Sequence, residues 1–143
     1  MINKSKELVS SIKLVNDKLN FIGKVDNNDP ISIDYISPLG DNLGYTSLEL
    51  FLLSLTSCLG STLLIFLRRM NKIIESFEIN ATGFRKEDHP TGFKNINIEI
   101  IIKSNNTEEE EVNKVLKMSE SYCPVLDMIK GNVETQVSFI INK

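Results

Sequence analysis

Two cysteines, Cys58 and Cys123, are the residues of this sequence best suited to chemistry. A thiolate is a nucleophile that oxidises readily, so two cysteines can cycle between a dithiol and a disulfide. An unperturbed thiol has a pKa near 8.5 and is only a few per cent ionised at neutral pH. Lowering that pKa to about 6 takes roughly 3.4 kcal/mol of stabilisation of the thiolate. A reactive cysteine therefore needs a cation or hydrogen-bond donors beside it.

The two cysteines lie in different sequence surroundings. Cys123 precedes Pro124, a residue that favours the first turn of a helix, and N–H groups at a helix start lower a thiol pKa. The simpler interpretation of Cys123 is a residue that separates two helices. Cys58 lies in an apolar segment, where free cysteine is commonly a small apolar filler. The residues alone leave both interpretations open for each cysteine.

The charged groups that would serve Cys58 are few. Arg68 and Arg69 follow it by ten and eleven residues, about 15 Å along one helix, so they reach it only from a partner subunit. Arg85, at the end of a predicted strand, is the better intramolecular candidate. Glu49 precedes Cys58 by nine residues, which places the two on opposite helix faces. Glu49 is then either a helix cap or part of another subunit's site.

Other chemistries find no support in the residues. One histidine, His89, and two separated cysteines do not make a zinc set, and no phosphate-binding loop is present. A net charge of -3 without a basic aromatic stripe excludes nucleic acid as an expected partner. We therefore expect no cofactor and no metal. Residues 1–6 contain no apolar signal core, and such sparse cysteines are typical of a reducing compartment, which predicts a cytoplasmic protein.

A helix over 46–72 must position Cys58. Thr46 and Glu49 have the spacing of a capping box, and the basic end at Arg68, Arg69 and Lys72 complements the helix dipole, with Asn71 closing the helix. The 18 residues 50–67 carry no charge. Their length approaches that of a membrane span, but seven of them are small or polar, which favours burial in protein over lipid.

Small residues on this helix permit close approach by another backbone. Ser57, Gly60 and Ser61 either face the chain's own sheet or face the same helix of a second copy. The second interpretation predicts a homodimer about a two-fold axis, and we favour it.

The remaining elements surround this helix. Alternating residues and turns predict three short antiparallel strands over 7–35, a hairpin of 77–82 with 96–100, and a final strand over 133–141. A capping box at Thr107 and Glu110 predicts a helix that stops before Pro124, and a short helix over 124–130 ends at Gly131. With no linker, residues 1–143 form one expected α+β domain, a mostly antiparallel sheet wrapped on one central helix.

The segment 40–58, Gly-Asp-Asn-Leu-Gly-Tyr-Thr-Ser-Leu-Glu-Leu-Phe-Leu-Leu-Ser-Leu-Thr-Ser-Cys, resembles the OsmC/Ohr superfamily of thiol peroxidases. The later segment Tyr122-Cys-Pro-Val and the His89-Pro90…Phe93 turn fit the same resemblance, the turn being similar to the YhfA-like branch. The resemblance implies an OsmC-like fold with a curved sheet and an intertwined homodimer whose sites lie at the subunit interface.

The resemblance also implies roles for residues. Cys58 would be the peroxidatic thiolate and Cys123 the resolving thiol, with a peroxide substrate and a dithiol reductant. Glu49 matches the family's motif glutamate, which helps to orient a catalytic arginine. Family peroxidases carry that arginine in their N-terminal strands, whereas this chain has none before Arg68, and Tyr45 and Ser47 stand where prolines are common. Arg85, Lys13 or Lys24 would have to substitute, a lysine without the bidentate fork of arginine.

Three functions follow as expectations. The first is a cytoplasmic peroxidase acting through Cys58 and Cys123, with Glu49 as a third catalytic residue. The second is a redox-sensing or ligand-binding protein of the same fold without efficient peroxide turnover. The third is a membrane-spanning protein, which we expect less because the flanking amphipathic strands need a helix to cover them.

Overall fold

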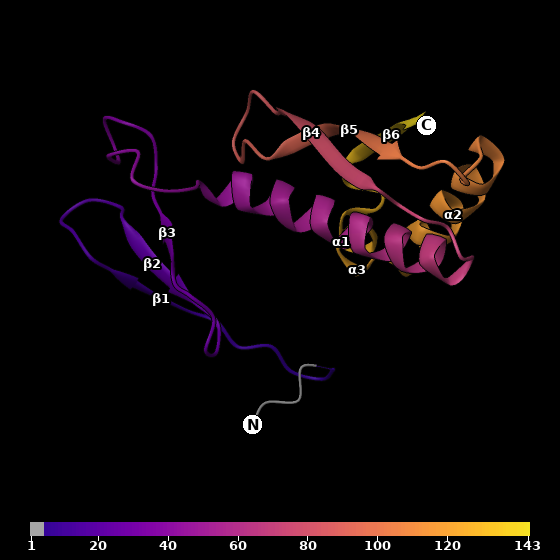
Figure 1. The fold of residues 1–143 in the computed structure, drawn as a ribbon. Coiled ribbons are helices and arrows are strands. Elements are labelled where there is room, and N and C mark those ends of the chain that lie inside the picture. The colour runs from indigo at the N-terminus through magenta and orange to yellow at the C-terminus, as the bar shows by residue number, and fades with distance from the viewer. Residues whose placement is uncertain (1–4) are drawn as a thin grey trace. The chain divides into compact units, whose positions relative to one another are not determined.

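The computed structural model describes residues 5–143 and divides into two compact units, one ending at Leu50 and one beginning at Phe51. The first unit holds three strands and the start of the long helix α1 (Figure 1). The second holds the rest of α1, three more strands and two further helices. Each unit is described in turn.

The first unit is built on a three-stranded antiparallel sheet. Strands β1 (Ser11–Leu14), β2 (Phe21–Lys24) and β3 (Ile31–Ile33) follow one another in space in the order β1-β2-β3. The register pairs Ile12 with Gly23, and Phe21 with Ile33. The predicted trio of short antiparallel strands is confirmed.

The buried carboxylate of Asp34 organises the loop that leads from β3 to α1. It accepts backbone N–H bonds from Tyr35 at 2.7 Å, Asp41 at 3.2 Å and Leu43 at 3.1 Å. Burial raises the pKa of this carboxyl, but the three N–H bonds outweigh it and hold the pKa below its ordinary value. Gly40 is required here, since a Cβ at this position would lie 2.1 Å from the carbonyl oxygen of Tyr35.

Helix α1 (Ser47–Arg69) begins and ends on the predicted signals. Thr46 N–H donates to Glu49 Oε1 at 2.8 Å, and Glu49 N–H donates back to Thr46 Oγ1 at 3.3 Å, which completes the capping box. At the other end Asn71 adopts a left-handed φ of 60°, and Lys72 N–H donates to the Leu67 carbonyl at 3.0 Å. This is a Schellman closure, which confirms the predicted role of Asn71.

The sheet of the second unit has β5 at its centre. Strands β4 (Ser76–Arg85), β5 (Phe93–Lys103) and β6 (Glu134–Asn142) pair in the order β4-β5-β6, the first pair antiparallel and the second parallel. One face is apolar and carries the fully buried isoleucines of β5. Helix α1 lies on this face, and Gly60 packs against Ile79 and Phe77 so closely that a Cβ there would be 3.0 Å from Ile79.

Two helices connect β5 to β6. Helix α2 (Glu109–Tyr122) places Val112, Val115 and Leu116 in the core, and α3 (Pro124–Ile129) follows after a break at Cys123. The capping box of α2 lies one residue later than predicted, because Glu108 N–H donates to Glu111 Oε2 at 2.9 Å. Thr107 is buried and its hydroxyl contacts Ser104 instead. Gly131, with φ of 82°, ends this segment as expected.

The α+β class and the mostly antiparallel pairing are confirmed, with one parallel pair and two separate sheets of three strands each. The strand alternation in the sequence shows which side chains share a face and gives no pairing direction. The parallel pairing of β5 with β6 was not predictable from that pattern.

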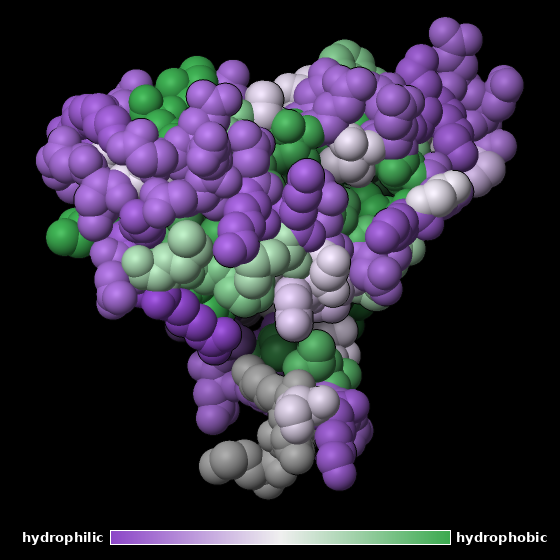
Figure 2. Space-filling model, turned by 90° about the vertical axis from the view of Figure 1, so that its right-hand side faces the viewer, coloured by the Kyte–Doolittle hydropathy of each residue, from purple (hydrophilic) through white to green (hydrophobic). Residues whose placement is uncertain are grey.

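Helix α1 is the one helix in residues 5–143 that is long and apolar enough to cross a membrane, by length and composition alone. Its buried residues Leu55, Leu59, Leu63 and Leu67 belong to the core that it shares with β5 and α2. Figure 2 views the molecule from the side where α2 lies in Figure 1 and shows mainly hydrophilic side chains there.

Candidate functional site: a dithiol between two helices

Cys58 and Cys123 meet in the second unit, although 65 positions separate them in the sequence. The Cys123 thiol donates to Cys58 Sγ with the two sulfur atoms 3.0 Å apart. Both residues are free cysteines. A disulfide has a sulfur separation of about 2.05 Å, so its formation here requires a closure of about 1 Å.

The break between α2 and α3 fixes the position of Cys123. Its N–H donates to the Ser119 carbonyl at 2.8 Å, and its own carbonyl accepts the N–H of Asp127 at 3.1 Å. Cys123 therefore closes one helix and opens the next, in an extended conformation at φ -82° and ψ 106°. Pro124 forces the break because a proline within a continuous helix would clash with the preceding turn.

The two thiols differ in exposure. Cys123 is 1% exposed, whereas Cys58 is only partly buried on α1. Cys58 packs against the same hydrophobic core to which Cys123 belongs. The ring of Tyr122, the residue before Cys123, stands edge-on to Phe66 with the ring centres 5.3 Å apart. The dithiol thus lies in apolar surroundings, with Cys58 as its more accessible member.

Burial first, and then the hydrogen bond to Cys58 and the charge of a Cys58 thiolate, together raise the pKa of the Cys123 thiol to about 11. The N–H groups of Leu126 and Val125 at the start of α3 lower this pKa, but by less. The expected lowering at the helix start is therefore wrong in its net direction. A six-residue helix offers few N–H donors, and desolvation of the thiolate outweighs them. Cys123 is a protonated thiol at neutral pH.

The arginines considered as the cation for Cys58 are either bound to another residue or exposed. Arg85 donates from Nε to the Thr91 carbonyl at 2.7 Å and also bonds the Thr91 hydroxyl, so its guanidinium is engaged at the end of its own hairpin. Arg68 and Arg69 are exposed in the last turn of α1. Among residues 5–143 no group of three or more histidine, cysteine, aspartate or glutamate side chains is arranged to hold a metal ion.

Glu49 belongs to the first unit, where its carboxylate caps α1. The hydrogen bonds from Thr46 hold the pKa of the Glu49 carboxyl below its ordinary value, so it is ionised at neutral pH. Its side chain is exposed. The predicted capping role is thus a structural fact, while its predicted catalytic role stays a prediction.

The fold and the site together define an α+β protein that holds a dithiol between a central helix and a helix break. The model of the OsmC-like protein family matches residues 40–138, which is more than half of the chain. The chain therefore belongs to the OsmC-like family, within the OsmC/Ohr superfamily.

Solved structures share this fold over nearly the whole chain. A hypothetical protein from Aquifex aeolicus is 25% identical, with a TM-score of 0.83, and the match covers 95% of this chain and 96% of that one. The OsmC-like protein of Mycoplasma pneumoniae is 19% identical, with a TM-score of 0.83 and coverage of 96% and 98%. The organic hydroperoxide resistance protein OhrB of Bacillus subtilis is 16% identical, with a TM-score of 0.65 and coverage of 94% and 98%. No curated protein sequence matches the chain.

Proposed function

We propose that this protein is a cytoplasmic thiol-dependent peroxidase that reduces organic hydroperoxides or hydrogen peroxide through Cys58 and Cys123. The observation that carries the proposal is the 3.0 Å contact between the two sulfur atoms. The OsmC-like family membership supports it, as does the similarity to proteins named for organic hydroperoxide resistance in Bacillus subtilis and Legionella pneumophila.

The difference in burial and the raised pKa of Cys123 divide the roles between the two thiols. Cys58 is the more exposed and accepts the hydrogen bond of its partner, so it suits attack on the peroxide as a thiolate. It takes the terminal oxygen of ROOH and becomes a sulfenic acid, while the alkoxide gains a proton and leaves as ROH. Cys123, buried and protonated, then attacks the sulfenic sulfur. Its proton and the displaced hydroxide form water, and a Cys58–Cys123 disulfide remains.

Oxidation of Cys58 also prepares Cys123 for its step. Two of the causes that raise the Cys123 pKa are its hydrogen bond to Cys58 and the negative charge on that sulfur. A sulfenic acid carries no such charge, so the Cys123 pKa falls when Cys58 is oxidised. The resolving thiol then ionises more readily at the point where it has to act as a nucleophile. A small dithiol exchanges with the disulfide and restores both thiols.

We propose further that two copies form a homodimer through α1. The side of α1 away from the sheet exposes Leu53, Ser57, Ser61 and Ile65, an apolar surface with small residues at its centre. Gly60, by contrast, packs against the chain's own sheet. Of the three small residues, Gly60 therefore faces the sheet, and Ser57 and Ser61 are the two left to face a second copy. The sheet of the first unit also exposes Ile12, Leu14 and Ile31. A three-stranded sheet needs a covered hydrophobic face to be stable.

Within this dimer we propose one OsmC-like domain over 1–143, with sites at the subunit interface. The family match supports a single domain because it runs across the boundary between the two units at Leu50. Glu49, ionised at neutral pH, is proposed to orient the cation that stabilises the Cys58 thiolate. Candidates for that cation are Arg85, Arg68 or Arg69 of a partner, and a lysine such as Lys13 or Lys24.

A second candidate function is a redox sensor or ligand-binding protein of the same fold. Two observations favour it: the chain has no arginine before Arg68, and the guanidinium of Arg85 is bound to Thr91. Without a cation beside Cys58 the dithiol would still form a reversible disulfide, but peroxide turnover would be slow.

Rapid-mixing oxidation of the reduced protein separates the two functions. For a peroxidase we expect fast thiol loss with cumene hydroperoxide or hydrogen peroxide, and Cys58→Ser abolishes it. Cys123→Ser is the matched control: it keeps the fast first step and stops at the sulfenic acid, which a sulfenic-acid reagent traps. Thiol loss in the parent no faster than that of free cysteine would rule out the peroxidase and leave the sensor.

A further inference from the structure

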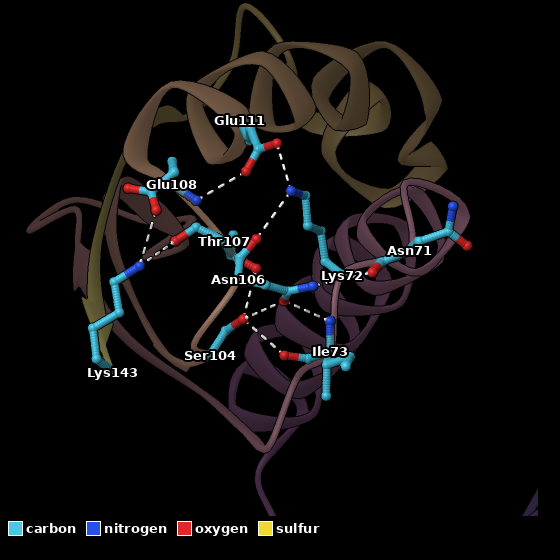
Figure 3. Close-up of polar contacts among 9 residues, drawn as sticks. All are labelled: Asn71, Lys72, Ile73, Ser104, Asn106, Thr107, Glu108, Glu111 and Lys143. Atoms are coloured by element: carbon cyan, nitrogen blue, oxygen red, sulfur yellow. Dashed lines mark hydrogen bonds and ion pairs between the residues drawn. The ribbon is translucent and has the colours of Figure 1, made fainter.

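A polar cluster joins the end of α1 to the start of α2 (Figure 3). Its centre is an ion pair in which Lys72 Nζ lies 2.6 Å from Glu111 Oε1. The side chains are 17% and 29% exposed, so this pair is less solvated than the other ion pairs of residues 5–143. We call Lys72, Glu111 and Asn106, whose carbonyl also contacts Lys72, the clamp.

Asn106 ties the clamp to the backbone on both sides. Its carbonyl accepts Lys72 Nζ at 2.9 Å, and its Oδ1 accepts the N–H of Ile73 at 2.9 Å. Its Nδ2 donates to the carbonyl of Asn71 at 3.2 Å. Asn71 and Lys72 are the residues that close α1, so the end of this helix is held by three separate bonds.

Two buried hydroxyls, those of Ser104 and Thr107, lie beside the clamp, as Figure 3 shows. Ser104 Oγ donates to the Ile73 carbonyl at 2.7 Å and lies 2.7 Å from Thr107 Oγ1. Both residues are fully buried, so these bonds are shielded from water and fix the segment between β5 and α2.

Glu111 connects the clamp to the start of α2. While Oε1 faces Lys72, Oε2 accepts the N–H of Glu108, the residue that caps the helix. The hydrogen bond from Lys72, together with that N–H, holds the pKa of the Glu111 carboxyl below its ordinary value. One carboxylate therefore joins the closure of α1 to the first turn of α2.

The clamp lies where α1 ends and α2 begins, whereas Cys58 lies at the middle of α1 and Cys123 follows the end of α2. Cys58 precedes the end of α1 at Arg69 by eleven residues, and Cys123 follows Glu111 by twelve. At 1.5 Å per residue these are lever arms of about 17 and 18 Å. A tilt of α2 by about 3° at the clamp would move Cys123 by about 1 Å, the closure that a disulfide requires.

We propose that Lys72 and Glu111 are positioning residues for the dithiol, which hold α1 and α2 at the angle that keeps Cys58 and Cys123 in contact. The proposal rests on the two-cysteine chemistry proposed above. Loss of the ion pair lets α2 tilt over a wider range, so that the two sulfur atoms spend less time at bonding distance. Disulfide formation then becomes slower and less favourable, because the reduced protein no longer holds the two sulfur atoms close together before they react.

Exchange with oxidised dithiothreitol tests the clamp without peroxide. The protein dithiol gives two electrons and two protons to the reagent, and protein disulfide and reduced dithiothreitol form. Alkylation of the remaining thiols gives the rate and the equilibrium constant. We expect Glu111→Gln, which keeps an acceptor for the Glu108 N–H, and Lys72→Met to lower both by about threefold to tenfold, the effect of a partly buried ion pair.

Two variants serve as controls. Lys72→Arg keeps the positive charge and should leave the equilibrium constant within about twofold of the parent. Lys103→Met removes the exposed Lys103–Glu75 pair, 3.4 Å apart in the same unit, and should change nothing. Unfolding of the reduced proteins is measured in parallel, and the exchange is run well below the unfolding transition. If Lys72→Met does not fold, the equilibrium constant of Glu111→Gln alone tests the proposal.

An equilibrium constant in folded Glu111→Gln that equals or exceeds that of the parent would overturn the proposal, as would a parent that forms no Cys58–Cys123 disulfide. The fate of the peroxidase is read separately. Slow peroxide reaction with a clamp-dependent disulfide rejects the peroxidase and keeps the clamp. A fast peroxide reaction together with a disulfide that does not depend on the clamp keeps the peroxidase and rejects the clamp.

Discussion

Glu49 has a structural role and a proposed chemical role, and these can be separated at the scale of single atoms. The cap needs only an acceptor at Oε1 for the N–H of Thr46. Orientation of a cation needs the negative charge. Glutamine supplies the acceptor without the charge, whereas alanine supplies neither.

We expect Glu49→Gln to fold as stably as the parent and to lose about tenfold in the rate of Cys58 oxidation, the factor that corresponds to about 1.4 kcal/mol of orientation energy. Rapid-mixing kinetics and thermal unfolding measure the two effects. Glu49→Ala should lose the same rate and also unfold at a lower temperature. Equal rates in Glu49→Gln and the parent would restrict Glu49 to its role as a cap.

Asp34 sets the conformation of an element, the loop between β3 and α1. Its pKa is held below the ordinary carboxyl value in the folded chain, so folding favours the ionised form. The stability that it contributes is complete above the unfolded pKa, about 4, and is lost as the pH falls through the folded pKa below that value.

Asp34→Asn should therefore lower stability at neutral pH and flatten its pH dependence in the acid range. Asparagine keeps one acceptor and cannot receive all three N–H groups. Urea unfolding from about pH 7 down to about pH 2 gives the comparison, with the exposed Asp29→Asn as control. Parallel pH profiles for Asp34→Asn and the parent would contradict this account.

Most elements could be predicted because their signals are local. The capping box at Thr46 and Glu49, Asn71 at the end of α1, and the Pro124 break all act within a few residues. The start of α2 was misplaced by one residue because Thr107 and Glu108 both have glutamates three residues later. Burial decided between them: the Thr107 hydroxyl faces Ser104 inside the protein.

The site was less predictable because its chemistry depends on packing. Pro124 predicts a helix start whose N–H groups lower the Cys123 pKa. The sequence does not show the burial of Cys123, which makes the net shift a rise. The charges of Lys72 and Glu111 suit the helix ends at which they lie in the sequence. No local pattern predicts that these two residues, 39 positions apart, form an ion pair. The contact of Cys58 with Cys123 is likewise a tertiary fact, which the resemblance implied and which local patterns did not contain.

For the whole molecule, the oligomeric state tests whether the exposed side of α1 is an interface between two copies. Ser61→Arg places a long charged side chain among Leu53, Ser57 and Ile65. We expect the parent to have a mass of about 32 kDa, twice the 16.2 kDa of one chain, and the variant to have the mass of one chain or to be poorly soluble. Analytical ultracentrifugation measures it.

The control is Ser121→Arg, at a serine on α2 that is also exposed, which should leave the mass at that of the dimer. A parent with the mass of one chain, or a Ser61→Arg variant that remains dimeric and soluble, would contradict the proposed interface.

The central position of β5 also bears on how the chain reaches its native state. It pairs on one side with β4, from which seven residues separate it along the chain, and on the other with β6, from which 30 residues separate it. During synthesis the hairpin of β4 and β5 therefore forms first, and one edge of an isoleucine-rich strand stays open until β6 arrives. Such an edge is a template for pairing between chains, so the interval before β6 docks is when nascent molecules are most prone to aggregate.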